Sequence, residues 1–133
     1  MLYAYWLEGN DKLSERVQQI HQTMLQRFDT LCSSLFVFGE LLVGPLKAND
    51  AAAASSIEQF FDSDGVTMLP YTPQAIRIFA DLRARHGVKA LDALHLSIAA
   101  TSGVDLFLTH DRRLHKLAVP GLPFIAGLET DLF

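Results

Sequence analysis

The sequence predicts an α/β fold, with a parallel sheet of short strands wrapped by helices. Short apolar runs alternate along the chain with segments of helical periodicity, which is the pattern of α/β proteins. The run Leu106–Leu108 is too short and too uniformly apolar for an exposed antiparallel strand, and it suits the buried strand of a parallel sheet. With 133 residues, 50% of them hydrophobic and 20% charged, the chain is expected to form one globular domain.

The first half of the chain is predicted to contain four helices and two strands. Helices are expected over residues 1–7, 11–28, 35–46 and 49–62, and strands over 30–34 and 66–69. The helix over 11–28 repeats apolar residues at helical spacing, so Leu25 and Phe28 are expected on its buried face. The helix over 35–46 is apolar all round, which predicts that it is buried on every side.

The second half is organised around residues 91–113. Pro73 is expected to open a helix, and a second helix from Leu91 should end at Gly103. Asp111 then lies just past the carboxyl end of the strand Leu106–Leu108, where open α/β sheets bind their ligands. A short helix over 112–117 and an edge strand at 124–125 complete the prediction.

Three carboxylates are candidates for a metal site. Glu40 is expected to be buried in an apolar helix, where its charge is costly unless a partner or a metal compensates it. Asp92 and Asp111 lie at a helix start and a strand end. If the three side chains converge, a hard cation such as Mg²⁺ or Mn²⁺ would remove their repulsion, and could orient a phosphate and activate a water.

Each of these carboxylates also has an ordinary structural interpretation. Glu40 could lie on an exposed stripe or pair with an arginine, and Asp92 and Asp111 could simply cap helices. A zinc or iron site is the competing chemistry, drawn from four residues: Asp92, His95, His110 and Asp111. The chain has no His-x-x-x-His pair and a single cysteine, so a packing or surface role for His95 is favoured.

Charge and hydropathy exclude several functional classes. The net charge of −4 argues against binding nucleic acid by bulk attraction, although basic residues gather around residues 77–89 and 112–116. Polar residues interrupt every apolar run before it reaches the roughly 18 residues of a membrane span. Without a basic leader at its start, the chain is expected to be cytoplasmic.

Three segments together resemble the PIN-domain family, and within it the VapC-like toxins. They are Phe-Gly-Glu-Leu-Leu at 38–42, Leu-Asp-Ala-Leu-His-Leu at 91–96 and Phe-Leu-Thr-His-Asp-Arg-Arg-Leu at 107–114. The resemblance implies a three-layer α/β/α, Rossmann-like domain over residues 1–133, with four to five short parallel strands. It also implies an endoribonuclease that uses Mg²⁺ or Mn²⁺, acts on RNA, forms a homodimer and is inhibited by a cognate antitoxin.

The resemblance assigns roles to individual residues. Glu40, Asp92 and Asp111 match acidic positions that bind the metal and are catalytic. Thr109 matches a hydroxyl residue beside the site, expected to hold Asp111 or a phosphate. The residues expected to contact the substrate are Ser34, Arg112 and Arg113.

The start of the chain departs from the family pattern. The family begins with a strand ending in an aspartate, which would lie about two residues before Met1. We therefore expect the chain as written to lack that strand and that carboxylate, through a misassigned start or a degenerate gene. Weak metal binding, poor cleavage and a disturbed or partner-filled sheet centre would follow.

Two other functions stay open. The domain could be a crippled PIN-like module that binds an antitoxin or dimerises through apolar N-terminal residues such as Tyr5 and Trp6. It could also be a metallophosphatase acting on small phosphoesters. The RNA target and the choice between one and two metal ions do not follow from the sequence.

Overall fold

The structure, a computed structural model, describes residues 12–63 and 65–133, which fall into two compact units. The first unit runs to Met68 and includes Thr130–Phe133, and the second unit is Leu69–Glu129. The last four residues join the first unit because Arg16 and Arg27 donate hydrogen bonds to the carbonyls of Thr130 (2.8 Å) and Leu132 (2.7 Å). The helix predicted over residues 1–7 lies outside the described residues.

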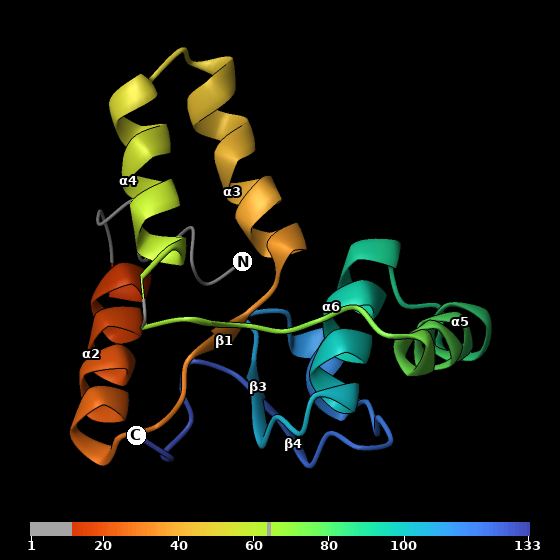
Figure 1. Cartoon of the computed structure of the whole chain (residues 1–133). Helices are drawn as coiled ribbons and strands as arrows, with labels where there is room; N and C mark the ends of the chain where they lie inside the picture. Colours follow the sequence, from red (N-terminus) through yellow and green to blue (C-terminus); the bar gives the residue numbers. More distant parts are fainter. Residues whose placement is uncertain (1–11, 64) are drawn as a thin grey trace. The chain divides into compact units, whose positions relative to one another are not determined.

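Within the first unit, residues 12–63 and 65–68 form three helices and a parallel pair of strands (Figure 1). In chain order these are α2 (Lys12–Arg27), β1 (Cys32–Ser33), α3 (Leu35–Lys47), α4 (Ala51–Phe61) and β2 (Thr67–Met68). Cys32 pairs with Thr67 and Ser33 with Met68. The positions of these elements agree with the prediction, although both strands are shorter than expected.

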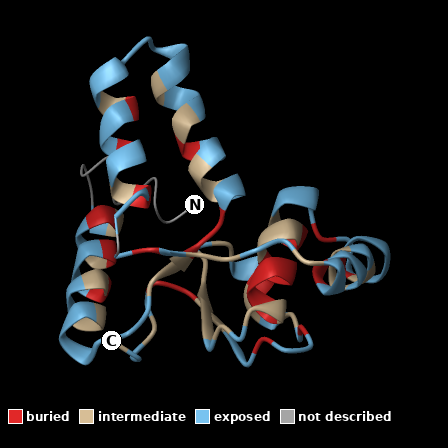
Figure 2. Ribbon diagram, in the orientation of Figure 1, coloured by how far each residue is buried: buried red, intermediate tan, exposed pale blue. Residues whose placement is uncertain are grey.

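The helix α3 is not buried on every side, so that prediction is wrong. Of its thirteen residues only Leu41 is buried, in a cluster with Ile57, Phe61 and Val66. The ring of Phe38 stacks on that of Phe61, with the ring centroids 5.0 Å apart. Because α4 covers one face, the other side of α3 stays exposed (Figure 2).

The end of α2 also differs from the prediction. Val17 and Ile20 are buried as the helical period requires, but Leu25 is 60% exposed and Phe28 is 94% exposed. The helix ends at Arg27, and Phe28 takes the left-handed conformation with φ of 61°. A residue in that conformation leaves the helical path, so its side chain no longer follows the buried face.

The second unit contains the region around which the sequence is organised. Its elements are α5 (Pro73–His86), α6 (Ala90–Thr101), β3 (Leu106–Leu108), the 3₁₀-helix η1 (Arg112–Lys116) and β4 (Phe124–Ala126). The strands β3 and β4 are parallel, with Phe107 opposite Ile125. Pro73 begins α5, as its fixed φ favours, and the predicted edge strand is β4.

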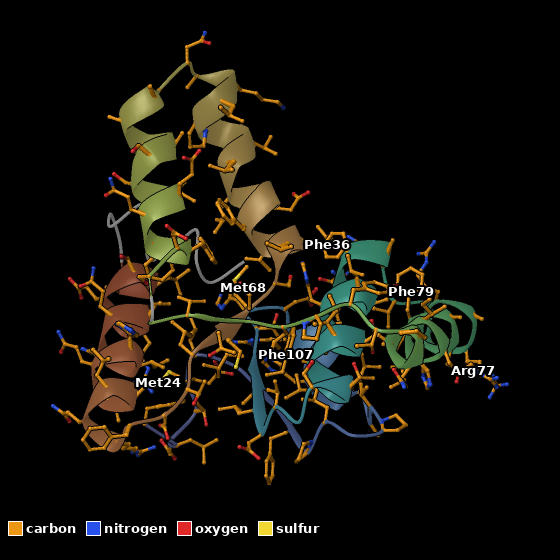
Figure 3. The ribbon with its side chains drawn as sticks, viewed as in Figure 1. Met24, Phe36, Met68, Arg77, Phe79 and Phe107 are labelled. Atoms are coloured by element: carbon orange, nitrogen blue, oxygen red, sulfur yellow. The ribbon has the colours of Figure 1, made fainter. Side chains whose placement is uncertain are left out.

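The core of the second unit is built on α6. Ala93 and Leu96 of this helix are fully buried, and Leu82 of α5 packs in the same cluster. Phe79 of α5 and Phe107 of β3 pack against this cluster, and both are labelled in Figure 3. The helix that carries Asp92 is therefore the best anchored element of the unit.

The α/β class with parallel strands is confirmed, but the expectation of one central sheet is not met by the described residues. Their four strands form two two-stranded sheets, β1–β2 and β3–β4, each within one unit. Strands of two or three residues offer few backbone groups for pairing. None of the described helices has the length and apolar run needed to cross a bilayer.

Candidate functional site

Asp111 starts η1 and binds Arg113 through both its carboxylate oxygens. Oδ1 accepts a hydrogen bond from the backbone N–H of Arg113 at 3.0 Å, which caps the short helix. The guanidinium donates from Nε to Oδ1 at 3.0 Å and from Nη2 to Oδ2 at 2.7 Å. The capping interpretation of Asp111 is thus correct, and the bidentate ion pair was not predicted.

Thr109 and His115 fix the loop that carries Asp111. The hydroxyl of Thr109 accepts a hydrogen bond from the backbone N–H of Asp111 at 3.1 Å, and the Thr109 N–H donates to the carbonyl of Ala126 at 3.0 Å. Nε2 of His115 lies 2.9 Å from the carbonyl oxygen of Thr109. Thr109 therefore contacts Asp111 as expected, while His115 is a supporting residue that sequence reasoning missed.

The charges around Asp111 keep it ionised. The hydrogen bonds and charge of Arg113, with a smaller contribution from Lys89, lower the pKa of Asp111 to about 2. In turn Asp111 raises the pKa of Arg113, and the negative charge of Asp92 adds to this effect. The charges of two predicted site residues, Asp92 and Asp111, therefore both raise the pKa of Arg113.

The helix α6 sets the position of Asp92. It is half-buried in the first turn of that helix, where a carboxylate is favoured by the helix dipole. The N-cap of α6 is Lys89, so the chain brings a cation and a carboxylate to the same helix end. This is the end whose charges reach the Asp111–Arg113 pair.

The first unit carries the other two predicted site residues. Glu40 is exposed on α3, so the expectation of a buried carboxylate is wrong, and its position alone no longer requires a compensating metal. Ser34 is buried, and its Oγ accepts a hydrogen bond from the N–H of Val37 at 3.3 Å, which caps α3. The convergence of Glu40 with Asp92 and Asp111 stays a prediction.

No ready-made multidentate metal site is present in the described part of the chain. Among residues 12–63 and 65–133, no group of three or more His, Cys, Asp or Glu side chains is placed to hold a metal ion. The zinc or iron centre proposed from Asp92, His95, His110 and Asp111 is therefore not assembled. The second unit offers two carboxylates: Asp111, which is paired with Arg113, and Asp92, whose charge helps to raise the pKa of the same arginine.

The two units differ in charge. The second unit has seven Lys and Arg against five Asp and Glu, whereas the first has four against ten. Both predicted basic clusters lie in the second unit, together with Asp92 and Asp111. The net charge of the whole chain thus hides a basic surplus beside the candidate site.

Some of these basic residues already have structural partners. On α5, Arg77 and Arg85 both pair with Asp81, at 3.5 and 3.7 Å, and Arg77 points outward from the helix (Figure 3). Arg83 donates a hydrogen bond to the carbonyl of Val88 at 3.2 Å. Near Asp111, Arg112 and Lys116 are exposed.

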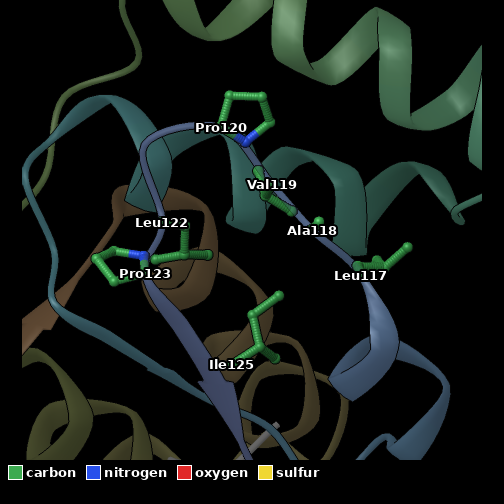
Figure 4. A pocket seen from close by; sticks show the side chains of 7 residues that line it. All are labelled: Leu117, Ala118, Val119, Pro120, Leu122, Pro123 and Ile125. Atoms are coloured by element: carbon green, nitrogen blue, oxygen red, sulfur yellow. The ribbon is translucent and has the colours of Figure 1, made fainter.

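The second unit also has an open hollow in the segment after η1. Figure 4 shows the residues that line it, all of which have apolar side chains: Leu117, Ala118, Val119, Pro120, Leu122, Pro123 and Ile125. No titratable side chain contributes to it, so it offers a packing surface and no chemistry.

Comparison with known proteins gives a family and nothing finer. Neither the curated proteins nor the solved structures gave a match. A family model described as "PIN domain" matches residues 2–120, a stretch that contains Glu40, Asp92, Thr109 and Asp111. Since the match covers nearly the whole chain, this protein belongs to the PIN domain family.

Proposed function

We propose that this protein is a metal-dependent endoribonuclease and the toxin of a toxin–antitoxin pair. The PIN domain family is a family of metal-dependent nucleases, which supports hydrolysis of a phosphodiester as the reaction. The observation that carries the proposal is the placement of two carboxylates in the second unit: Asp111 just past the end of β3, where Arg113 holds it, and Asp92 in the first turn of α6.

The donor atoms of this pair fit a hard divalent ion. Mg²⁺ prefers oxygen ligands and is commonly held by one or two carboxylates, with waters and substrate phosphates filling its other positions. The Arg113 guanidinium is hydrogen-bonded to Asp111, and the charge of Asp92 helps to raise the pKa of that arginine, so the surroundings of both carboxylates favour positive charge. Asp92 and Asp111 would hold the ion, with Glu40 as the predicted third ligand. A bound ion would supply an activated water and neutralise charge on the phosphate.

The remaining residues of the loop would orient the site and the substrate. Thr109 and His115 hold the backbone on which Asp111 is placed. Exposed Arg112 and Lys116 follow directly on the same short helix and would bind RNA phosphates. The substrate class proposed is therefore RNA, contacted mainly through its backbone.

Cleavage of RNA by site variants tests the proposal. The assay uses the chain together with any residues that its gene encodes before Met1, with Mg²⁺ or Mn²⁺. Asp92→Asn and Asp111→Asn should each lower the rate roughly 100-fold or more, because each removes a carboxylate that would hold the metal ion, and the ion is what would neutralise charge on the reacting phosphate. The matched control is Asp105→Asn, the same change at an exposed acid of the second unit. Unchanged cleavage by the two site variants would refute the assignment.

Substrate choice separates the nuclease from a metallophosphatase. The same preparations are tested on single-stranded RNA and on nucleoside monophosphates. Cleavage within RNA with no release of phosphate from the monophosphates is expected. The opposite preference would replace the nuclease proposal by the phosphatase.

The proposed antitoxin is tested by co-expression with the product of the neighbouring gene. The two proteins should co-purify, and the complex should cleave RNA more slowly than the free chain. Growth arrest on expression of the chain alone, relieved by co-expression, would support the toxin assignment. Growth unaffected by an active nuclease would count against it.

A binding module is the second candidate, supported by the exposed apolar residues of α3. Leu35 is 70% exposed and Leu46 63%, and Phe36 and Val43 are also exposed. Apolar residues exposed along one helix are typical of an interaction surface, either with an antitoxin or within a homodimer. Partner binding or dimerisation in a protein without nuclease activity would favour this candidate.

A further inference from the structure

The side chain of Arg113 uses both oxygens of the carboxylate that the proposed metal ion needs. Its planar guanidinium matches the two oxygens of Asp111 in a bidentate pair, with distances of 3.0 and 2.7 Å. Oδ1 accepts a further bond from the backbone N–H of Arg113. The Asp111 carboxylate therefore accepts three hydrogen bonds from a single residue.

A divalent ion and this guanidinium are expected to exclude one another. A carboxylate has about four lone-pair directions, and three of those of Asp111 are used by Arg113. An ion at the remaining direction would lie next to a positive group that is 2.7 Å from Oδ2. The positive charges of the ion and the guanidinium repel each other. The negative charge of Asp92, which favours the charged guanidinium, would not neutralise both cations at once.

The pair can also open from the arginine side. The Arg113 side chain is 70% exposed, so it has room to turn into solvent, whereas the Asp111 side chain is only 27% exposed and stays in place. Opening gives up two charge-assisted hydrogen bonds, which the interaction of Asp111 with a divalent ion would replace. The backbone cap of η1 depends on the N–H of Arg113 and would persist after the side chain leaves.

We propose that Arg113 is an exchangeable counter-cation of Asp111, which the divalent ion must displace on binding. The inference rests on the proposed function only in that a divalent ion binds Asp111. Arg113 then lowers the affinity of the site for metal. Its freed guanidinium becomes available to an RNA phosphate beside the ion, which would give it the substrate contact predicted from the sequence. Arg113 is in this sense a positioning residue that couples binding of the divalent ion to binding of the RNA phosphate.

Mn²⁺ binding to metal-free protein tests the inference without any reaction. Free Mn²⁺ is measured by electron paramagnetic resonance at fixed ionic strength for the unsubstituted chain, Arg113→Ala, Arg113→Lys and Arg112→Ala. Arg113→Ala should bind about tenfold tighter, the size of effect typical of residues that contact a metal ligand. Arg113→Lys keeps the charge but loses the bidentate geometry, so its gain in Mn²⁺ affinity should be smaller.

Arg112→Ala is the matched control, because it removes the same charge from the exposed neighbour on η1. The gain in Mn²⁺ affinity of Arg112→Ala should stay below about threefold, as expected for a charge screened by solvent and salt. Equal gains for Arg112→Ala and Arg113→Ala, weaker binding by Arg113→Ala, or no Mn²⁺ binding to any variant would overturn the inference. Circular dichroism of the metal-free proteins checks folding, and Arg113→Lys carries the test if the alanine variant unfolds.

The outcomes also separate the inference from the nuclease proposal. Tighter Mn²⁺ binding by Arg113→Ala with no RNA cleavage by any version would support the counter-cation role of Arg113 and refute the nuclease proposal. RNA cleavage that depends on Asp111, with unchanged Mn²⁺ affinity in Arg113→Ala, would support the nuclease proposal and refute the counter-cation role of Arg113.

Discussion

Replacement of Gly121 by alanine should destabilise the second unit strongly. Gly121 has φ of +86°, a conformation that residues with a Cβ rarely adopt. A Cβ at this position would lie 2.5 Å from the carbonyl oxygen of Ala100. That oxygen belongs to the backbone of α6, at a residue that is itself buried, so it cannot turn aside as a flexible side chain would.

The expected cost has two parts. The left-handed conformation costs roughly 1–2 kcal/mol for a residue with a Cβ. Moving packed backbone to relieve the contact costs a further amount of about 1–3 kcal/mol. Gly121→Ala should therefore lose about 3 kcal/mol in the free energy of unfolding. Gly103 is the matched control, because its φ is +73° but a Cβ there would meet nothing within 4 Å. Gly103→Ala should lose only about 1 kcal/mol, the conformational part alone.

Urea unfolding followed by circular dichroism measures both losses. Thermal unfolding should show the same order, with Tm lowered by about 10 °C for Gly121→Ala and about 4 °C for Gly103→Ala in a chain of this size. Equal losses in the two variants would refute the close approach of the 117–123 segment to the end of α6. Since α6 carries Asp92, such a result would also weaken the placement of that carboxylate.

Three other changes test the described contacts. Ser34→Ala should cost about 1 kcal/mol of unfolding free energy in urea, because it removes the N-cap of α3; no loss would show that the cap is not formed. The carboxyl ¹³C resonance of Asp111 in metal-free protein should titrate at about pH 2, and Arg113→Ala should raise this pKa. Because the folded-state pKa of Asp111 is depressed, its stabilisation is complete above the unfolded-state pKa near 4 and is lost as the pH falls through about 2; an ordinary pKa would refute the ion pair. Leu96→Ala should cost about 3 kcal/mol, since the side chain is fully buried; a loss under about 1 kcal/mol would contradict the core assignment.

Much of the secondary structure could be predicted because it depends on local patterns. Pro73 begins α5 and the strand Leu106–Leu108 is where its short apolar run indicates. The burial of a helix depends on which other elements pack against it, and the pattern of apolar residues in that helix alone does not show this. The helix α3 is apolar all round, but α4 covers only one of its faces. Phe28 was placed on a buried face because the end of α2 was not foreseen, and one left-handed residue moved it to the surface.

The candidate site was predictable in its position but not in its contacts. A strand end followed by Asp111 could be located from the sequence, and so could the first-turn position of Asp92. The pairing of Asp111 with Arg113 depends on the N-cap of η1, where the extended backbone of Asp111 lets its carboxylate accept the N–H two residues on, and the guanidinium of the same residue then reaches both oxygens. An acid at a helix start with an arginine two residues later is the signal that could have suggested it.

The net charge of −4 was the strongest argument against a protein that binds RNA, and the division of charge between the units answers it. The acidic surplus belongs to the first unit, while the second unit has a basic surplus and also holds Asp92 and Asp111. Bulk attraction would require excess positive charge over the whole molecule, but a local surplus suffices when few phosphates are contacted. While its charge is paired with Asp111, Arg113 contributes nothing to that surplus. If a divalent ion displaces it, the ion neutralises the carboxylates and releases a cation, so that metal binding and attraction for RNA would rise together.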